Sequence, residues 1–197
     1  MKTAPIRLFH HSRRDAGFSL VEVLVSVLVL TVGLVGTAVI QLNAFRTTEQ
    51  SGFHNTAVAI ATQIADEIRT NSHQMRLASS PFNSFRYEAE SVAPADTPPV
   101  NCYKTSCKPE EWAAHSMVEW QSRVFSTLPG GRVEICRDKD VFDTVSGDFR
   151  WCGSIANPVN EPVVVKIGWD EKDPSGALVD GNAPPPRVVI LVSPFTQ

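Results

Sequence analysis

Residues 17–42 decide the fold, and they read GFSLVEVLVSVLVLTVGLVGTAVIQL. From Phe18 to Leu42 this run is apolar apart from small hydroxyl residues, Gln41 and one carboxylate, Glu22. A helix of about 20 such residues crosses a hydrocarbon core of about 30 Å. We therefore expect a membrane-spanning helix, with an acid only a few residues from its start.

Valines recur with a period of two at the start of this run, at Val21, Val23, Val25, Val27 and Val29. That alternation alone is typical of a strand. A lone strand in lipid would leave its backbone donors and acceptors unpaired, whereas a helix pairs them internally. The membrane environment therefore favours the helix.

A short basic segment precedes the run, with four cations and the single acid Asp15: Lys2, Arg7, Arg13 and Arg14. Positive charge beside an apolar segment stays cytoplasmic, so the C-terminal part should lie across the membrane. A secretory signal has an apolar region of about 7–15 residues and an A-x-A-like site. This run is longer and has no such site, so an uncleaved anchor is one open interpretation.

The composition of the 197-residue chain leaves room for one modest globular domain beyond the apolar run. Its net charge is −3 and no basic stripe is visible, which argues against a nucleic-acid partner. The sequence holds no Ser-His-Asp order, G-x-S-x-G or phosphate-binding glycine loop. We expect no enzyme, no cofactor and no small-molecule substrate.

All four cysteines follow the apolar run: Cys102, Cys107, Cys136 and Cys152. An even number on one side of a membrane segment indicates disulfides in an oxidising compartment. Three pairings are possible, and we favour the sequence-local pairs Cys102–Cys107 and Cys136–Cys152. Zinc is the alternative, but no C-x2-C pair exists and only His115 lies near in sequence. We expect no metal.

The histidines and several clustered acids are weaker candidates for metal ligands. We expect surface or packing roles for His54, His73 and His115, and no metal role for His10-His11. Four aspartates surround the proposed Cys136–Cys152 loop, at Asp138, Asp140, Asp143 and Asp148. They lack the glycine and closing glutamate of a calcium loop, so we favour solvated acids over calcium ligands. Asp170, Glu171 and Asp173 have the same ambiguity.

The helix should continue past the membrane, because apolar residues recur every three or four positions at Phe53, Ala57, Ile60, Ile64 and Ile68. A helix from Phe18 to about Asn71 would be roughly 80 Å long. The alternative is two helices with a break at Ser51-Gly52.

The remaining sequence predicts a connector, one helix and several strands. Residues 79–109 are rich in proline and serine and predict an irregular connector. A helix should run over residues 108–128, because proline in its first turn and the acids that follow favour a helix N-terminus. It should bury Trp112, His115 or Met117, Trp120 and Val124. Strands are predicted at residues 132–136, 149–155, 162–169 and 187–192. A long helix packed on a small antiparallel sheet is an α+β fold.

The junction at Gly17 resembles the class III signal of type IV prepilins and pseudopilins: glycine, aromatic, hydroxyl, two aliphatics and glutamate, after a basic leader. The resemblance implies that prepilin peptidase cuts after Gly17 and methylates the new N-terminus, Phe18. It makes Glu22 the fifth mature residue, which in pilins meets the N-terminus of a neighbouring subunit. An α-amino group is positively charged near neutral pH, so the two charges would attract in a low-dielectric bundle.

Downstream blocks are similar to PilV-type minor pilins, namely residues 66–69, Glu119-Trp120, residues 128–131 (LPGG) and residues 165–171 (VKIGWDE). One departure from many major pilins is Val39, which stands where they have a mid-membrane proline. The resemblance implies a type IV pilin-like fold in four parts. These are a cleaved leader at 1–17, a transmembrane and assembly helix at 18–45, its amphipathic continuation at 46–74, and a periplasmic globular domain at 75–197.

The resemblance further implies a minor pilin that acts in type IV pilus assembly, and hence in twitching motility or adhesion. Its expected partners are prepilin peptidase, other minor pilins, the major pilin and inner-membrane lipid. Its expected locations are the inner membrane, with the C-terminal domain in the periplasm, and then the pilus. Two alternatives remain open at this stage: a minor pseudopilin of type II secretion and an uncleaved, single-pass anchored adhesin.

Overall fold

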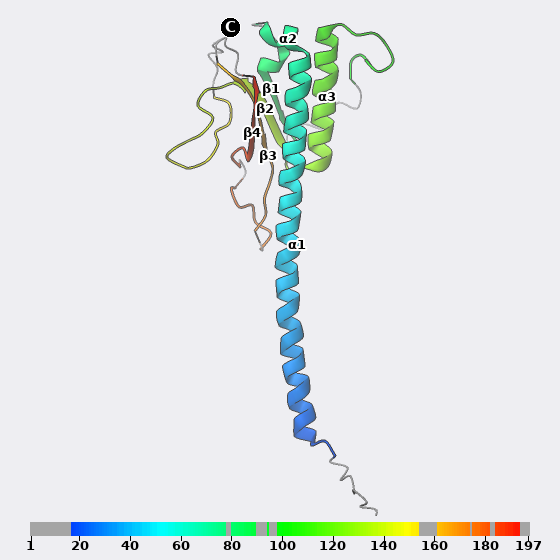
Figure 1. Cartoon of the computed structure of the whole chain (residues 1–197), viewed down its shortest axis with the longest axis vertical. Coiled ribbons are helices and arrows are strands. Elements are labelled where there is room, and N and C mark those ends of the chain that lie inside the picture. The colour runs from blue at the N-terminus through cyan, green and yellow to red at the C-terminus, as the bar shows by residue number, and fades with distance from the viewer. Residues whose placement is uncertain are drawn as a thin grey trace, which may run out of the picture. The chain divides into compact units, whose positions relative to one another are not determined.

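A computed structural model of the chain describes residues 17–77, 80–89, 94, 98–153, 161–173, 175–181 and 184–193 (Figure 1). The chain forms two compact units, the first ending at Arg46 and the second beginning at Thr47. The predicted α+β class is confirmed: the structure has a long N-terminal helix and a four-stranded antiparallel sheet.

Helix α1 runs from Leu20 to Thr70, a continuous stretch of 51 residues. The alternative break at Ser51-Gly52 is absent, since both residues are helical and the Ser51 hydroxyl donates to the Thr47 carbonyl at 2.9 Å. Such a bond satisfies the hydroxyl without leaving the helix.

The second half of α1 buries one face in the globular unit. Its buried residues lie three or four apart, as an amphipathic helix requires: Ala57, Ile60, Ala61, Ile64, Ala65 and Ile68. Each fully buried isoleucine contributes about 1.5–3 kcal/mol relative to its exposed state. The sequence periodicity therefore identified the packed face correctly, with Phe53 partly buried at its edge.

The predicted connector over residues 79–109 is partly wrong. A short helix α2, Ser72–Arg76, is followed by the 3-10 turn η1, Pro81–Asn83, and by strand β1, Ser84–Glu88. The side chains of β1 alternate between exposed and buried, and the strand pairs with β2 along its length. A five-residue segment is too short to reveal itself by periodicity, and its pairing with a distant strand stabilises it.

The other strands are β2, Arg132–Arg137, β3, Val163–Gly168, and β4, Val188–Ser193. The order is β1-β2-β3-β4 and each neighbouring pair is antiparallel. Because side chains alternate across a sheet, the register divides them into two faces. One face joins the helical core through two rows: Phe85, Ile135, Val165 and Ile190, then Tyr87, Val133, Ile167 and Val188.

Helix α3, Pro109–Thr127, lies beside the second half of α1 (Figure 1). Its start is close to the end of α1, where the Asn71 side chain donates to the Pro109 carbonyl at 2.9 Å. Proline opens α3, as the sequence predicted, and the Glu111 carboxylate accepts the Lys108 amide at 2.8 Å. Trp120 is fully buried, but Trp112 is 38% exposed, so its predicted burial is wrong.

The predicted strand at residues 149–155 is also wrong where the structure describes it. Phe149 forms only an isolated bridge with Phe142, and residues 150–153 are not in a strand. The segment is instead attached to strand β2, because Cys152 forms a disulfide with Cys136 and its amide donates to the Glu134 carboxylate. Residues 154 and 155 lie outside the described residues.

Candidate functional site

The N-terminal junction is open to its surroundings. Residues 17–19 precede α1 without helical structure, and the Phe18 side chain is 83% exposed. The Ser19 carbonyl accepts the first helical bond from the Val23 amide at 3.2 Å. Among the described residues, and apart from its chain neighbours, no atom lies within 4 Å of a Cβ built on Gly17. The described side of the junction is therefore exposed and lies outside the helix.

Glu22 lies in the first turn of α1, where a negative charge is favoured by the helix dipole. Among the described residues its carboxylate has no hydrogen-bond or ion-pair partner. It is also the only ionisable residue between Leu20 and Phe45. A charge within a membrane helix costs about 2.5–3.5 kcal/mol at the helix centre and is usually paired. The structure therefore leaves Glu22 with its pairing capacity unused.

The N-terminal part of α1 presents an apolar surface on every side. All large apolar side chains between Phe18 and Phe45 are at least 52% exposed. The best 18-residue window has a mean hydropathy of 2.7, which suffices for a membrane span. Soluble monomers rarely expose contiguous apolar patches of more than a few hundred Å². Lipid or other protein must therefore cover this segment.

The polar side chains of this segment do not disturb its apolar surface. The hydroxyls of Ser26, Thr31 and Thr37 each donate to a backbone carbonyl three or four residues earlier, at 2.7–2.9 Å. Gly33 and Gly36 have open space where a side chain would be. Small residues at such positions let neighbouring helices approach closely.

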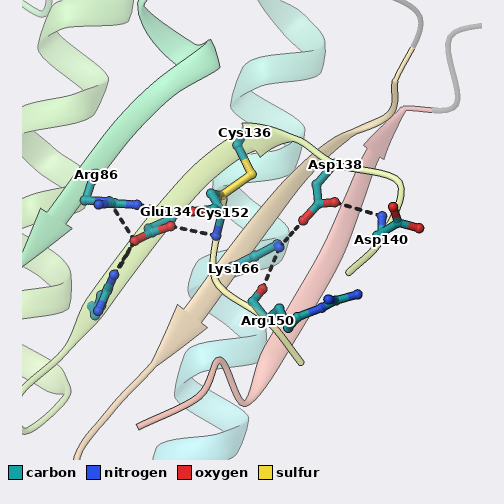
Figure 2. The surroundings of a disulfide bond; sticks show 9 residues. Arg86, Glu134, Cys136, Asp138, Asp140, Arg150, Cys152 and Lys166 are labelled. Atoms are coloured by element: carbon teal, nitrogen blue, oxygen red, sulfur yellow. Dashed lines mark hydrogen bonds and ion pairs between the residues drawn. A yellow bond between two sulfur atoms is a disulfide. The ribbon is translucent and has the colours of Figure 1, made fainter. Parts of the chain in front are cut away.

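In the globular unit, the Cys136–Cys152 disulfide lies on the sheet face opposite the helices (Figure 2). Beside it, the buried Glu134 carboxylate accepts the Cys152 amide at 2.9 Å and contacts the guanidinium groups of Arg86 and Arg132 at 2.7 and 2.6 Å. The disulfide and Glu134 thus attach the end of the loop to β2.

The next strand holds the same loop through a buried lysine. Lys166 of β3 is fully buried, and its ammonium group donates to the Asp138 carboxylate at 2.5 Å and to the Arg150 carbonyl at 2.6 Å (Figure 2). We call Glu134, Lys166 and Asp138, with the Cys136–Cys152 bond, the loop clasp. Sequence reasoning missed Glu134 and Lys166. The available signal was a charged residue between apolar neighbours in each strand, Glu134 in VEI and Lys166 in VKI.

The four aspartates around this loop do not converge. Asp138 pairs with Lys166, whereas Asp143 accepts the amides of Val145 and Ser146 in a turn. These backbone donors hold the pKa of Asp143 below its usual value. The described residues contain no group of three His, Cys, Asp or Glu side chains suited to a metal ion.

The acidic turn after β3 is likewise structural. Glu171 pairs with Arg187 at 2.7 Å, and Asp173 accepts the Ser175 hydroxyl and backbone amides. Those donors lower the pKa of Asp173, with the Ser175 hydroxyl contributing most. Nearby, the Asp170 amide donates to the Pro129 carbonyl at 2.8 Å. This contact joins the LPGG and WDE segments that the sequence singled out.

The second disulfide, Cys102–Cys107, closes a short ring before α3. Both disulfides join sequence-local pairs. Of the histidines, His115 is buried and packs on Tyr103, with ring centroids 4.9 Å apart. His54 meets the Trp169 ring edge at 6.1 Å and His73 is exposed, so all three have packing or surface roles.

Comparison with known families matches residues 12–38 to the prokaryotic N-terminal methylation motif. The matched region contains Gly17, Phe18 and Glu22 and the first part of α1. The match supports a protein of the prepilin or pseudopilin type, a structural rather than an enzymatic class. With the long apolar helix, it fits a membrane-anchored protein. Neither a curated protein nor a solved structure matches the chain.

Proposed function

We propose that the chain is a minor pilin of a type IV pilus, a structural subunit that enters the filament through the N-terminal part of α1. The observation that carries this proposal is the uncovered apolar surface from Phe18 to Phe45, interrupted by the single charge of Glu22. A bilayer covers such a surface before assembly, and neighbouring helices cover it afterwards.

Processing comes first in this proposal. Prepilin peptidase cuts the peptide between Gly17 and Phe18, and the new N-terminus is methylated. The cut creates an ammonium group close in sequence to Glu22. In a bundle of such helices, this group on one subunit pairs with the Glu22 carboxylate of another and offsets part of the desolvation of both.

The proposed location follows from charge and redox chemistry. The basic leader remains cytoplasmic, so the globular unit lies in the periplasm. The two disulfides suit that oxidising compartment. Other minor pilins and the major pilin are the proposed neighbours once the subunit leaves the inner membrane.

Mass spectrometry of the mature protein tests the processing step. We expect a chain that begins at Phe18 with one added methyl group, and a Gly17→Leu variant that retains Met1. A wild-type protein that retains Met1 would contradict the proposal and support an uncleaved anchor.

Filament incorporation tests the role of Glu22. We expect Glu22→Gln to be cleaved normally but lost from sheared filaments, because the amide carries no charge to pair with the new N-terminus. Glu49→Gln is the matched control, since Glu49 is an exposed acid of the same helix. Normal incorporation of Glu22→Gln would overturn this role.

Gene deletion separates the pilus from a secretion system. We expect the deletion strain to lose surface pili and twitching motility. A strain that keeps both but fails to secrete proteins would assign the subunit to a pseudopilus.

A further inference from the structure

A cavity of about 490 Å³ lies within the globular unit, between the end of α1, helix α3 and the ring closed by Cys102–Cys107. This volume is within the range of about 300–1,000 Å³ that is typical of small-ligand pockets. The assembly role proposed above makes no use of it.

Aromatic side chains form much of the cavity wall. Trp112 and Tyr103 meet edge to face, with ring centroids 6.0 Å apart, and both line the cavity. Behind them His115 packs against both rings, at 4.9 and 5.6 Å. Trp112 is thus left partly exposed because it borders the cavity, although its helix position predicted burial.

The wall that carries Tyr103 is fixed in place. The Cys102–Cys107 bond closes its ring, and the Tyr103 amide donates to the Asn101 side chain at 3.1 Å. Just before this ring, the Val100 carbonyl lies 3.2 Å from a ring nitrogen of the buried His115 in α3. A site organised in this way loses little conformational entropy when a ligand binds.

Two carboxylates line the same cavity. Glu67 accepts the Trp120 indole N–H at 2.7 Å, and Glu119 accepts the Tyr103 hydroxyl at 3.0 Å. No lysine or arginine is among the described residues of the lining. Along α3, the Arg123 guanidinium donates to the Gln63 amide oxygen, and the His115 Nε2 atom lies 3.6 Å from the Glu119 carboxylate.

The carboxylates of Glu67 and Glu119 affect the titration of Tyr103 in the cavity wall. The pKa of Tyr103 is raised above 10.0, first by the hydrogen bond to Glu119, then by burial and by the charges of Glu119 and Glu67. Arg123 opposes this effect but does not cancel it. Glu67 accepts the Gln63 and Trp120 N–H groups, which are neutral donors and leave its negative charge in place. Aromatic rings beside such carboxylates favour a cation, because both attract positive charge.

We propose that this cavity binds an ammonium or guanidinium group, either of a small amine or of a lysine or arginine side chain. Glu67 and Glu119 supply the charge, and the rings of Trp112 and Tyr103 supply the cation–π contacts. This inference goes beyond the assembly role and does not depend on it, since no residue of the cavity belongs to the N-terminal junction.

Binding is tested on the full chain in a neutral polyoxyethylene detergent, which offers neither choline nor sugar headgroups. The probes are Nα-acetyl-arginine amide, Nα-acetyl-lysine methyl amide and tetramethylammonium, with Nα-acetyl-citrulline amide as the uncharged match for arginine. We expect the cationic probes to shift the indole N–H resonances of Trp112 and Trp120 in a saturable manner, and citrulline to leave them unchanged. Preference for the amino-acid probes over tetramethylammonium would identify a side chain as the natural source.

Two variants test which residues hold the cation. Glu119→Gln keeps an acceptor for the Tyr103 hydroxyl but removes the charge, and should weaken binding by roughly tenfold or more. Trp112→Leu should weaken it through the lost ring face, while Glu49→Gln should bind as the wild type does. Near-ultraviolet circular dichroism checks that each variant is folded.

Three results would overturn the proposal. They are equal binding of citrulline and arginine probes, affinity that Glu119→Gln leaves unchanged in a folded protein, and the absence of saturable shifts with every cationic probe.

Discussion

The buried ammonium group of Lys166 lies 2.5 Å from the Asp138 carboxylate, and this pair joins the third strand of the sheet to the loop closed by Cys136–Cys152. The lysine is fully buried, whereas the Asp138 side chain is 18% exposed. The two charges therefore differ in their access to water if the pair is broken. Asp138 can turn toward water, but Lys166 cannot.

This asymmetry predicts unequal effects of the two single substitutions. Asp138→Ala should lower the free energy of unfolding by about 3 kcal/mol, because it leaves a buried charge without its partner. Lys166→Met removes the charge itself and fills similar space, so we expect a loss of about 1 kcal/mol. Denaturant unfolding of the full chain, followed by tryptophan fluorescence, measures both.

Asp138 also accepts the Asp140 amide at 2.8 Å, so the variant Asp138→Asn serves as a control that keeps an acceptor. Asp140→Ala, at an exposed neighbour, should change stability by less than about 0.5 kcal/mol. A larger loss for Lys166→Met than for Asp138→Ala would contradict the assignment of the buried charge as the vulnerable partner.

The two disulfides should contribute differently to stability. The cysteines of Cys136–Cys152 are 16 residues apart and those of Cys102–Cys107 are five apart. By chain entropy, removing the longer ring should cost about 3 kcal/mol and removing the shorter one about 2 kcal/mol. Paired Cys→Ser variants, compared by thermal unfolding, test this order. The reverse order would show that loop entropy does not govern these two bonds.

The long-range order of the fold follows from local sequence patterns only in part. Helical periodicity predicted the buried face of α1, and proline followed by acids predicted the start of α3. Strand β1 was not predicted, because five residues are too few to show a clear hydrophobic alternation and because pairing with β2 stabilises the strand. The strand expected near Phe149 does not form, because that segment bonds to Val141 and Phe142 of its own loop and to the side chains of Glu134 and Lys166.

The sites differ in the same way. Gly17, Phe18 and Glu22 are adjacent in sequence, so a motif could reveal them without a fold. The loop clasp and the aromatic cavity gather residues from distant segments, and no spacing rule connects Glu67 with Glu119 or Asp138 with Lys166. For the loop clasp, the single charges of Glu134 and Lys166 inside apolar strands were the available signal, but they do not identify their partners.

Gly130 should tolerate substitution poorly, because its backbone and its surroundings both require glycine. Its φ is +56°, and an added Cβ would overlap the Asp170 carboxylate. Gly147 provides a matched control, since its φ is +80° but its Cβ would meet open space. We expect Gly147→Ala to cost about 1–2 kcal/mol from backbone conformation alone.

Gly130→Ala should cost more than this control, because the Asp170 carboxylate must also move. Thermal unfolding of the two variants gives the comparison. Equal losses would show that the LPGG turn is constrained by its backbone angles and not by its contact with the segment after β3.

The titration of Tyr103 gives a pH-dependent test of the charges around the aromatic cavity. The chain has two tyrosines, and the hydroxyl of Tyr87 is buried with no hydrogen-bond partner among the described residues. Tyr87→Phe removes that unpaired hydroxyl, so it should leave stability unchanged or raise it by about 1 kcal/mol. In this background the near-ultraviolet absorbance of tyrosinate reports Tyr103 alone.

We expect the pKa of Tyr103 to be raised above 10.0 in the Tyr87→Phe protein. Glu119→Gln should bring this pKa back toward 10.0, because it removes the Glu119 charge and leaves only a weaker, neutral acceptor for the hydrogen bond. A raised pKa means that the folded state favours the neutral phenol. Its contribution to stability is therefore complete below the unfolded pKa and is lost as the pH rises through the folded pKa. Glu49→Gln should leave the titration unchanged. If Glu119→Gln also left it unchanged, the Glu119 carboxylate could not be the group that sets the charge of the cavity wall.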